Sequence, residues 1–87
     1  MSEQIVLYGT RWCGDCFVAK RVLKQHGVDY TEIDIENDPA ARQHVQDING
    51  GYKSTPTIIF PSGAVIVEPS RRELEDALRR EGLIPAA

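Results

Sequence analysis

The chain has 87 residues, 41% of them hydrophobic, which is enough for one compact core and too little for two. We therefore expect residues 1–87 to form a single domain. The net charge of -3 at pH 7 offers no basic surface for nucleic acid, and no apolar run approaches the roughly 20 residues that span a bilayer. The amino terminus lacks the basic and apolar regions of an export signal, so we expect a cytoplasmic protein with no membrane partner.

The first half of the chain alternates strand and helix patterns. Residues 5–8 are an apolar run that predicts a strand buried on both faces. Apolar residues then recur at three- and four-residue steps over residues 14–26, which predicts an amphipathic helix. Residues 28–35 place apolar side chains among charged ones and predict a second strand.

The second half begins with a helix signal and continues with a hairpin signal. Asp38 is a favourable N-cap residue and Pro39 suits the first helical position, so a second helix is predicted up to the glycines at 50 and 51. Residues 57–60 and 64–68 flank a Pro-Ser-Gly turn, which predicts a β-hairpin.

The last element is a helix whose start is marked by Ser70 and Glu73, the pattern of a capping box, and whose end is marked by Gly82. The order is then β-α-β-α-β-β-α, which predicts an α/β protein. Its four-stranded mixed sheet would carry three helices distributed over both faces. This plan resembles the thioredoxin fold.

The chain has only two cysteines, Cys13 and Cys16, and they lie too close together to staple distant parts of a secreted protein. They follow the first predicted strand and open the first helix. The free N–H groups and the dipole at a helix amino end favour a thiolate on Cys13, so we expect it to be the nucleophile. Cys16 is one turn further in and more buried, and we expect it to be the resolving thiol.

A zinc site is the alternative for the two cysteines, since the chain also has His26 and His44. A Cys2His2 site wants its histidines three to five residues apart, and these two are much further apart. We expect no metal. His26 is better explained as a partner for the carboxyl end of the first helix, and His44 as a solvated side chain.

Three residues beside the cysteines have both a functional and a plain interpretation. Asp15 opposes a thiolate on Cys13 and favours the helix amino end, or is simply a solvated acid. Arg11 offsets Asp15 and attracts an anionic thiol substrate, or is an ordinary exposed charge. Trp12 forms part of a contact surface for substrate, or serves packing alone.

Thr55 and Pro56 precede the third predicted strand, where a proline suits an edge or a cis turn. Trp-Cys-x-x-Cys after the first strand, together with Ser-Thr-Pro-Thr at residues 54–57, resembles the glutaredoxin and thioredoxin superfamily. The resemblance implies that Pro56 is cis and faces the cysteine pair, and that the Thr55 backbone contacts the substrate. The short chain and the sequence of residues 50–63 resemble mycoredoxins and related actinobacterial glutaredoxins most.

Two departures from the glutaredoxin pattern concern the small thiol. Thr10 stands where the family usually has a lysine, and residues 67–72 lack the two glycines and the acid that normally hold glutathione. The resemblance therefore favours another low-molecular-weight thiol, such as mycothiol or bacillithiol. We hypothesise that Arg71 and Arg72 meet an anionic part of it, the alternative being ordinary exposed charges.

The sequence thus predicts a thiol–disulfide oxidoreductase that acts on disulfide-containing proteins and has no bound cofactor. Its co-substrate would be a low-molecular-weight thiol, namely mycothiol, bacillithiol or glutathione. A redoxin recycled by a flavoprotein thioredoxin reductase, of the type that serves ribonucleotide reductase, is one alternative. An iron–sulfur module bridging two subunits and a purely structural interaction domain are the others. We expect a monomer.

Overall fold

The computed structural model describes residues 4–86, and its elements follow the predicted order. They are β1 (Ile5–Gly9), α1 (Gly14–Gln25), β2 (Tyr30–Asp34), α2 (Pro39–Ile48), β3 (Thr57–Ile59), β4 (Val65–Val67) and α3 (Arg71–Arg80). No helix within this part of the chain has the length and apolar character needed to cross a membrane.

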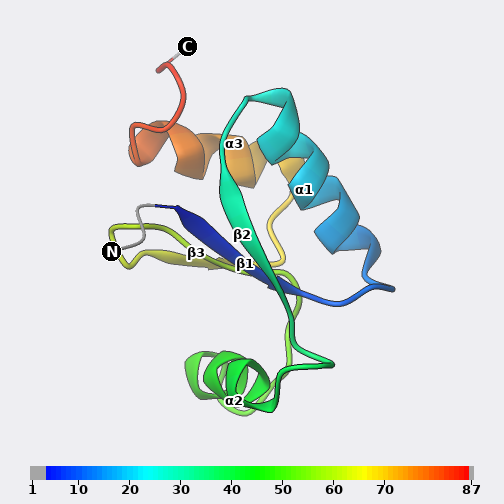
Figure 1. The fold of residues 1–87 in the computed structure, drawn as a ribbon. Helices are drawn as coiled ribbons and strands as arrows, with labels where there is room; N and C mark the ends of the chain where they lie inside the picture. Colours follow the sequence, from blue (N-terminus) through cyan, green and yellow to red (C-terminus); the bar gives the residue numbers. More distant parts are fainter. Residues whose placement is uncertain (1–3, 87) are drawn as a thin grey trace.

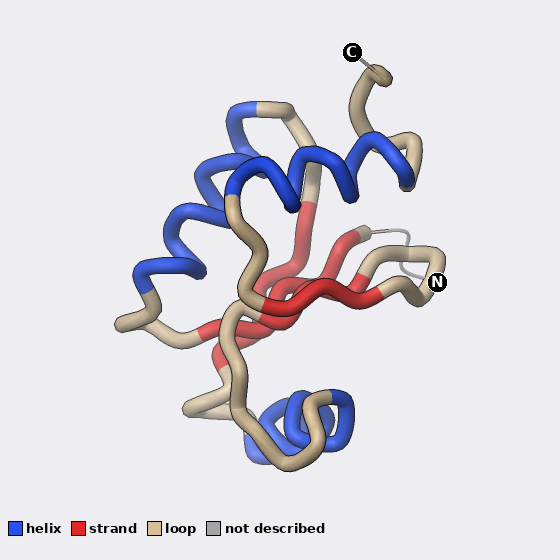
Figure 2. Tube along the Cα trace, turned by 180° about the vertical axis from the view of Figure 1, so that it is seen from behind, coloured by secondary structure: helices blue, strands red, loops and turns tan. Residues whose placement is uncertain are grey.

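The strands form one sheet in the order β2-β1-β3-β4. β1 runs parallel to β2 and antiparallel to β3, and β4 closes the sheet as the antiparallel partner of β3. Figures 1 and 2 show α1 and α3 together on one face of the sheet and α2 alone on the other. The predicted mixed four-stranded sheet with three helices, a thioredoxin-like fold, is confirmed.

The two faces of the sheet are covered unequally. The main core lies between the sheet, α1 and α3, and its buried residues are Ile5, Leu7, Ala19, Val22, Leu23, Ile58, Phe60, Leu74, Ala77, Leu78 and Ile84. The core under α2 consists of Ile35, Ala41 and Val45, with Tyr8 and Ile33 partly buried against it. The prediction that the first strand is buried on both faces was therefore only half right, because the α2 side covers β1 incompletely.

The second strand is shorter than the predicted residues 28–35. The N–H of Val28 donates to the carbonyl of Leu23 at 2.9 Å and so belongs to the end of α1, where Gly27 has a positive φ of 67°. At the other end, the Ile35 N–H still donates to the Gly9 carbonyl at 3.0 Å. Ile35 itself is already the first residue of the turn toward α2. The strand is therefore Tyr30–Asp34.

The predicted caps and hairpin are present. The Asp38 carboxylate accepts the Ala41 N–H at 3.0 Å, and Ser70 and Glu73 form both bonds of the capping box. In the hairpin, Phe60 and Ala64 close the turn by a 2.9 Å backbone bond instead of extending the strands. The strands are accordingly shorter than the predicted residues 57–60 and 64–68.

Candidate active site

Cys13 is the N-cap residue of α1 and comes four positions after the last residue of β1. Its backbone is extended, with φ of -87° and ψ of 107°, and its Sγ accepts the N–H of Cys16 at 3.0 Å. A cap acceptor satisfies one of the free N–H groups at the start of the helix. The sulfur that was predicted to lie at the amino end of the helix therefore lies there and receives a backbone hydrogen bond.

Cys16 lies one turn further along α1 and is buried, with 1% of its surface exposed. Burial, and after it the hydrogen bond with Cys13, raises the pKa of the Cys16 thiol to about 12. Gly9 of β1 makes room for it, since a Cβ at Gly9 would lie 2.8 Å from the Cys16 Sγ. Both cysteines are free thiols here, and the inner one keeps its proton.

The Thr55-Pro56 peptide bond is cis and lies against Cys13, as the resemblance implied. The Cys13 thiol donates to the Thr55 carbonyl oxygen at 3.5 Å. One hydrogen bond within this segment and one from the residue after β4 hold it in place. The Thr57 hydroxyl donates to the Ser54 carbonyl at 2.8 Å, and the Glu68 N–H donates to the Pro56 carbonyl at 2.9 Å. The Thr55 backbone is thus fixed beside the sulfur.

Trp12 and Arg11 lie at the surface next to Cys13. Trp12 is 85% exposed, so packing does not explain it. Arg11 is exposed and makes no hydrogen bond or ion pair within residues 4–86, so the expected offset of Asp15 does not take the form of a direct pair. Both side chains are free to meet a molecule that approaches Cys13.

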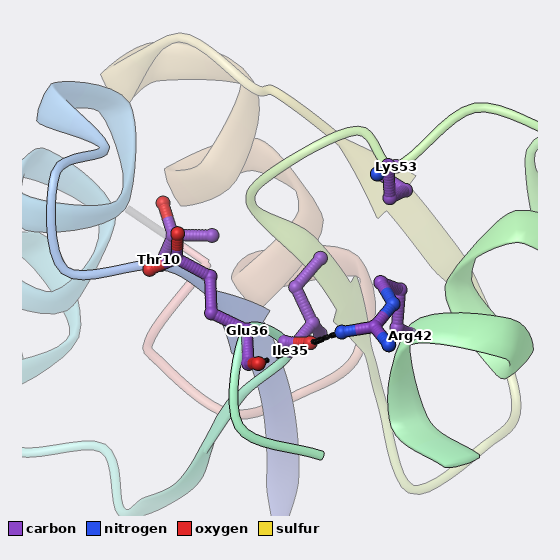
Figure 3. A pocket seen from close by; sticks show the side chains of 5 residues that line it. All are labelled: Thr10, Ile35, Glu36, Arg42 and Lys53. Carbon is purple, nitrogen blue, oxygen red and sulfur yellow. Dashed lines mark hydrogen bonds between the residues drawn. The ribbon is translucent and has the colours of Figure 1, made fainter. Parts of the chain in front are cut away.

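A cavity of about 400 Å³ opens beside the Thr10 end of β1 (Figure 3) and is lined by Thr10, Ile35, Glu36, Arg42 and Lys53. The Arg42 guanidinium donates to the Ile35 carbonyl at 2.9 Å, which holds it at the wall. In this view Thr10 and Glu36 lie on one side and Arg42 and Lys53 on the other. Since Thr10 also accepts the Cys13 N–H at 3.4 Å, the cavity adjoins the reactive sulfur.

Sequence reasoning did not single out Glu36, Arg42 or Lys53. They come from the turn after β2, from α2 and from the loop before β3, so only the fold brings them together. One signal was available for Lys53, which stands two residues before Thr55 and therefore close to the cysteine pair. The cavity lining is cationic on balance, with Arg42 and Lys53 against Glu36.

Arg71 lies away from the cysteine pair. Its Nη2 donates to the Gln25 Oε1 at 2.6 Å, and its Nε is 3.6 Å from Glu75. Gln25 ends α1 at the opposite end from Cys13, so these contacts direct the Arg71 side chain away from the cysteine pair and do not support the hypothesis that Arg71 meets an anionic part of the small thiol. Arg72 is exposed, and its part in that hypothesis stays a prediction.

The two histidines are on different sides of the sheet. His26 is the C-cap residue of α1, as its predicted role requires, and its Nε2 is 2.8 Å from the Glu75 carboxylate. His44 is exposed on α2, and its ring centroid is 5.7 Å from that of Tyr8. Within the described residues, no three His, Cys, Asp or Glu side chains gather in a way that could hold a metal ion.

The chain is similar to known proteins over most of its length. The sequence model of the glutaredoxin family matches residues 5–65. A Mycobacterium tuberculosis protein named as a glutaredoxin is 36% identical over 78 residues, which cover 90% of this chain and 93% of that protein. Mycoredoxin 1 of Corynebacterium glutamicum is 30% identical over 73 residues, which cover 83% of this chain and 89% of that protein.

A solved structure agrees with the sequence comparisons. The glutaredoxin of Archaeoglobus fulgidus superposes with a TM-score of 0.76 at 25% identity and covers 91% of this chain and 88% of its own. The fold, the family match and the cysteine pair lead to one conclusion. The chain belongs to the glutaredoxin family of thiol–disulfide oxidoreductases.

Proposed function

We propose that this single domain is a dithiol redoxin that reduces protein disulfides and mixed disulfides, with Cys13 as nucleophile and Cys16 as resolving thiol. The observation that carries the proposal is the contrast between the two sulfurs. The Cys13 Sγ is partly exposed, at a helix amino end, and accepts a backbone N–H at 3.0 Å. Cys16 is buried and its pKa is raised to about 12. Cys13 is therefore suited to be the attacking thiolate, and Cys16 is suited to stay protonated until it resolves the mixed disulfide.

The exchange proceeds in two displacements. The Cys13 thiolate attacks one sulfur of the substrate disulfide, a new S–S bond forms as the old one breaks, and the leaving thiolate takes a proton from water. Cys16 then loses its proton and attacks the Cys13 sulfur, which releases the second substrate thiol and leaves a Cys13–Cys16 disulfide. The substrate has gained two electrons and two protons. Two small thiol molecules return them and leave as their own disulfide.

The raised pKa of Cys16 suits this order of events. Burial is its largest cause and the hydrogen bond with Cys13 the second. When Cys13 is consumed in a mixed disulfide, the second cause disappears, and Cys16 becomes easier to ionise at the moment it is needed. Thr55, whose carbonyl lies 3.5 Å from the Cys13 sulfur, and cis Pro56 would align the substrate backbone for in-line attack.

We further propose that the co-substrate is a small thiol of the mycothiol type and that the protein binds no cofactor. We also propose that the protein is a monomer and is located in the cytoplasm. The similarity to mycoredoxin 1 supports mycothiol over bacillithiol and glutathione. The cavity beside Thr10 would take the part of the thiol that carries no sulfur. Arg42 and Lys53 supply cationic donors there, although Thr10 replaces the lysine that glutaredoxins usually have before the cysteines.

The test is turnover of mixed disulfides between a model peptide and mycothiol, bacillithiol or glutathione. We expect mycothiol to give the highest kcat/KM. Cys13→Ser should abolish turnover, whereas Cys16→Ser should retain it, since the small thiol itself can release the product. Lys53→Gln should raise KM about two- to fivefold with little change in kcat, the expected loss of one exposed charge contact.

Two results would overturn the proposal in different ways. If all three mixed disulfides fail but the protein reduces insulin with thioredoxin reductase, and both cysteine variants are inactive, the protein is a reductase-linked redoxin. If the purified protein is coloured and contains iron, it is a cluster-carrying module.

A further inference from the structure

The outer face of α1 carries exposed apolar and cationic side chains in line with the reactive sulfur. Phe17, Arg21 and Lys24 recur at four- and three-residue steps after Cys13, so they share one face of the helix. Phe17 is 64% exposed, and Trp12, just before Cys13, is 85% exposed. We call these four side chains, Trp12, Phe17, Arg21 and Lys24, the α1 face.

The α1 face is hollowed. A groove of about 390 Å³ is lined by Phe17, Lys20, Arg21, Lys24 and Gln25. Its walls are one aromatic ring and the long stems of basic side chains, which combine apolar surface with charged tips. Such a groove has room for side chains of a docked chain, and it begins one helical turn from Cys13.

The charge on this face is unpaired. Lys20 bonds Glu32 of β2 at 2.7 Å, so its charge already has a partner. The side chains of Arg21 and Lys24 make no hydrogen bond or ion pair with any residue that the structure describes. Apart from the paired Lys20, residues 11–25 hold three cationic side chains and one acidic one, although the chain as a whole has a net charge of -3. The surface next to the nucleophile is thus positive on a negative protein.

We propose that the α1 face docks an acidic segment of the protein whose disulfide is reduced; this rests on the proposed function and names its substrate class. Arg21 and Lys24 lie eight and eleven positions beyond Cys13, about 12 and 16 Å along the helix at 1.5 Å per residue. An extended chain rises about 3.3 Å per residue. The substrate therefore carries Asp or Glu about three to five residues from its reacting cysteine, and an apolar residue nearer to it meets Trp12 and Phe17.

Binding is measured first, without redox chemistry. The probe is a short peptide with Ser in place of its cysteine, an apolar residue beside that Ser, and two Glu about four residues away. A matched peptide carries Gln in place of both Glu. Because Trp12 is the chain's only tryptophan, its fluorescence reports the occupied α1 face. We expect the Glu peptide to bind about three- to tenfold more tightly, and this preference to vanish at high salt.

Turnover is measured next with the cysteine forms of both peptides as mixed disulfides. Wild type should prefer the Glu peptide in kcat/KM by a similar factor. Arg21→Glu should abolish or reverse the preference in binding and in turnover. Arg80→Glu is the matched control, because it changes the net charge equally on an exposed residue at the far end of α3 and should keep the preference. Both variants should reduce a small uncharged disulfide at the wild-type rate.

The outcomes separate the two proposals. Equal binding and equal turnover of the two peptides would overturn the docking proposal and leave the redox function standing. The same loss in Arg80→Glu as in Arg21→Glu would also overturn it, since the effect would then come from net charge. Failure of wild type on every disulfide would overturn the proposed function, while tighter binding of the Glu peptide would still show an acidic ligand on the α1 face.

Discussion

Gly9 sits where the end of β1 meets the thiol of Cys16, and no other residue fits there without movement. A Cβ at this position would lie 2.8 Å from the Cys16 Sγ. We expect Gly9→Ala to lower the free energy of unfolding by about 1–3 kcal/mol, the usual cost of forcing atoms into a packed site. It should also slow the release of substrate by Cys16. Urea unfolding and single-turnover kinetics measure the two effects.

Gly14→Ala is the control for that substitution. Gly14 also lies beside the cysteines, but a Cβ there would meet nothing within 4 Å. Alanine favours the helix, so this variant should be as stable as wild type or slightly more stable. Equal urea midpoints for Gly9→Ala and wild type would contradict the close approach of Gly9 to Cys16.

The buried thiol of Cys16 has its own pH signature. In Cys13→Ser, burial still raises the pKa of Cys16, so its alkylation by iodoacetamide should be slow at neutral pH and still rising above pH 10. In wild type, unfolded Cys16 ionises near 9.0 and folded Cys16 near 12, so folding stability falls as the pH rises between these values. For the alkylation experiment, the control is Cys13→Ser unfolded in denaturant. A rate that levels off near pH 9 without denaturant would contradict the raised pKa.

For individual residues, the sequence predicted those features that depend on the spacing of neighbours along the chain. The places of Cys13 and Cys16 at a helix start follow from their spacing after the first strand. The cis bond before Pro56 was implied by the family resemblance of its short motif, and the exposure of Trp12 was one of two interpretations that the sequence left open. Gly9 was missed because its approach to Cys16 crosses from β1 to α1 and depends on how the two elements pack. Lys53 was missed because the residues that line the cavity with it are at least eleven positions away in the sequence.

The capping box of α3 is the best-defined element boundary. The Ser70 hydroxyl accepts the Glu73 N–H at 3.1 Å, and the Ser70 N–H donates to the Glu73 carboxylate at 2.8 Å. Ser70→Ala should lower the free energy of unfolding by about 1 kcal/mol. Ser70→Asp keeps an acceptor at the cap and should cost little. Chemical denaturation of the two variants beside wild type measures this, and equal losses would contradict the capping role.

α1 and α3 are joined at the far end from Cys13 by a His26–Glu75 contact of 2.8 Å. The hydrogen bond from His26 holds the pKa of Glu75 below its ordinary value of 4.5. Because the carboxyl pKa is lower in the folded state, ionised Glu75 contributes to the free energy of unfolding above pH 4.5, and this contribution is lost as the pH falls through the folded pKa. Wild type should therefore lose more melting temperature than Glu75→Gln between pH 6 and pH 3. Parallel losses would contradict this contribution.

Element types were predictable, and element ends were less so. The capping box and the Asp38 cap were predicted because their signal is local. The second strand was drawn too long since Val28 looks apolar and β-prone, yet its N–H closes α1 by bonding Leu23. Hydrophobic pattern alone does not show which element receives a backbone hydrogen bond.

The whole molecule is built on two cores of unequal size. The core beneath α1 and α3 has eleven buried residues, and the core beneath α2 has three. Local opening costs less where fewer apolar contacts break. In native-state hydrogen exchange, the amides of α2 should therefore exchange faster than those of β1 and α1. Val45→Ala should speed α2 exchange alone, whereas Leu23→Ala should lower protection across the molecule. Uniform protection of all three helices would contradict this division.

The two edge strands of the sheet determine how readily copies of the molecule aggregate by pairing edge to edge. An unpaired edge strand invites another chain to continue the sheet, and long, flat, apolar edges invite it most. Here one edge is β4, three residues long, after which Glu68 turns the chain away with a φ of 48°. The other edge, β2, exposes Thr31 and Glu32. Neither edge offers a neighbour more than a brief ladder, so the protein should tolerate crowding at high cellular concentrations without templating fibres.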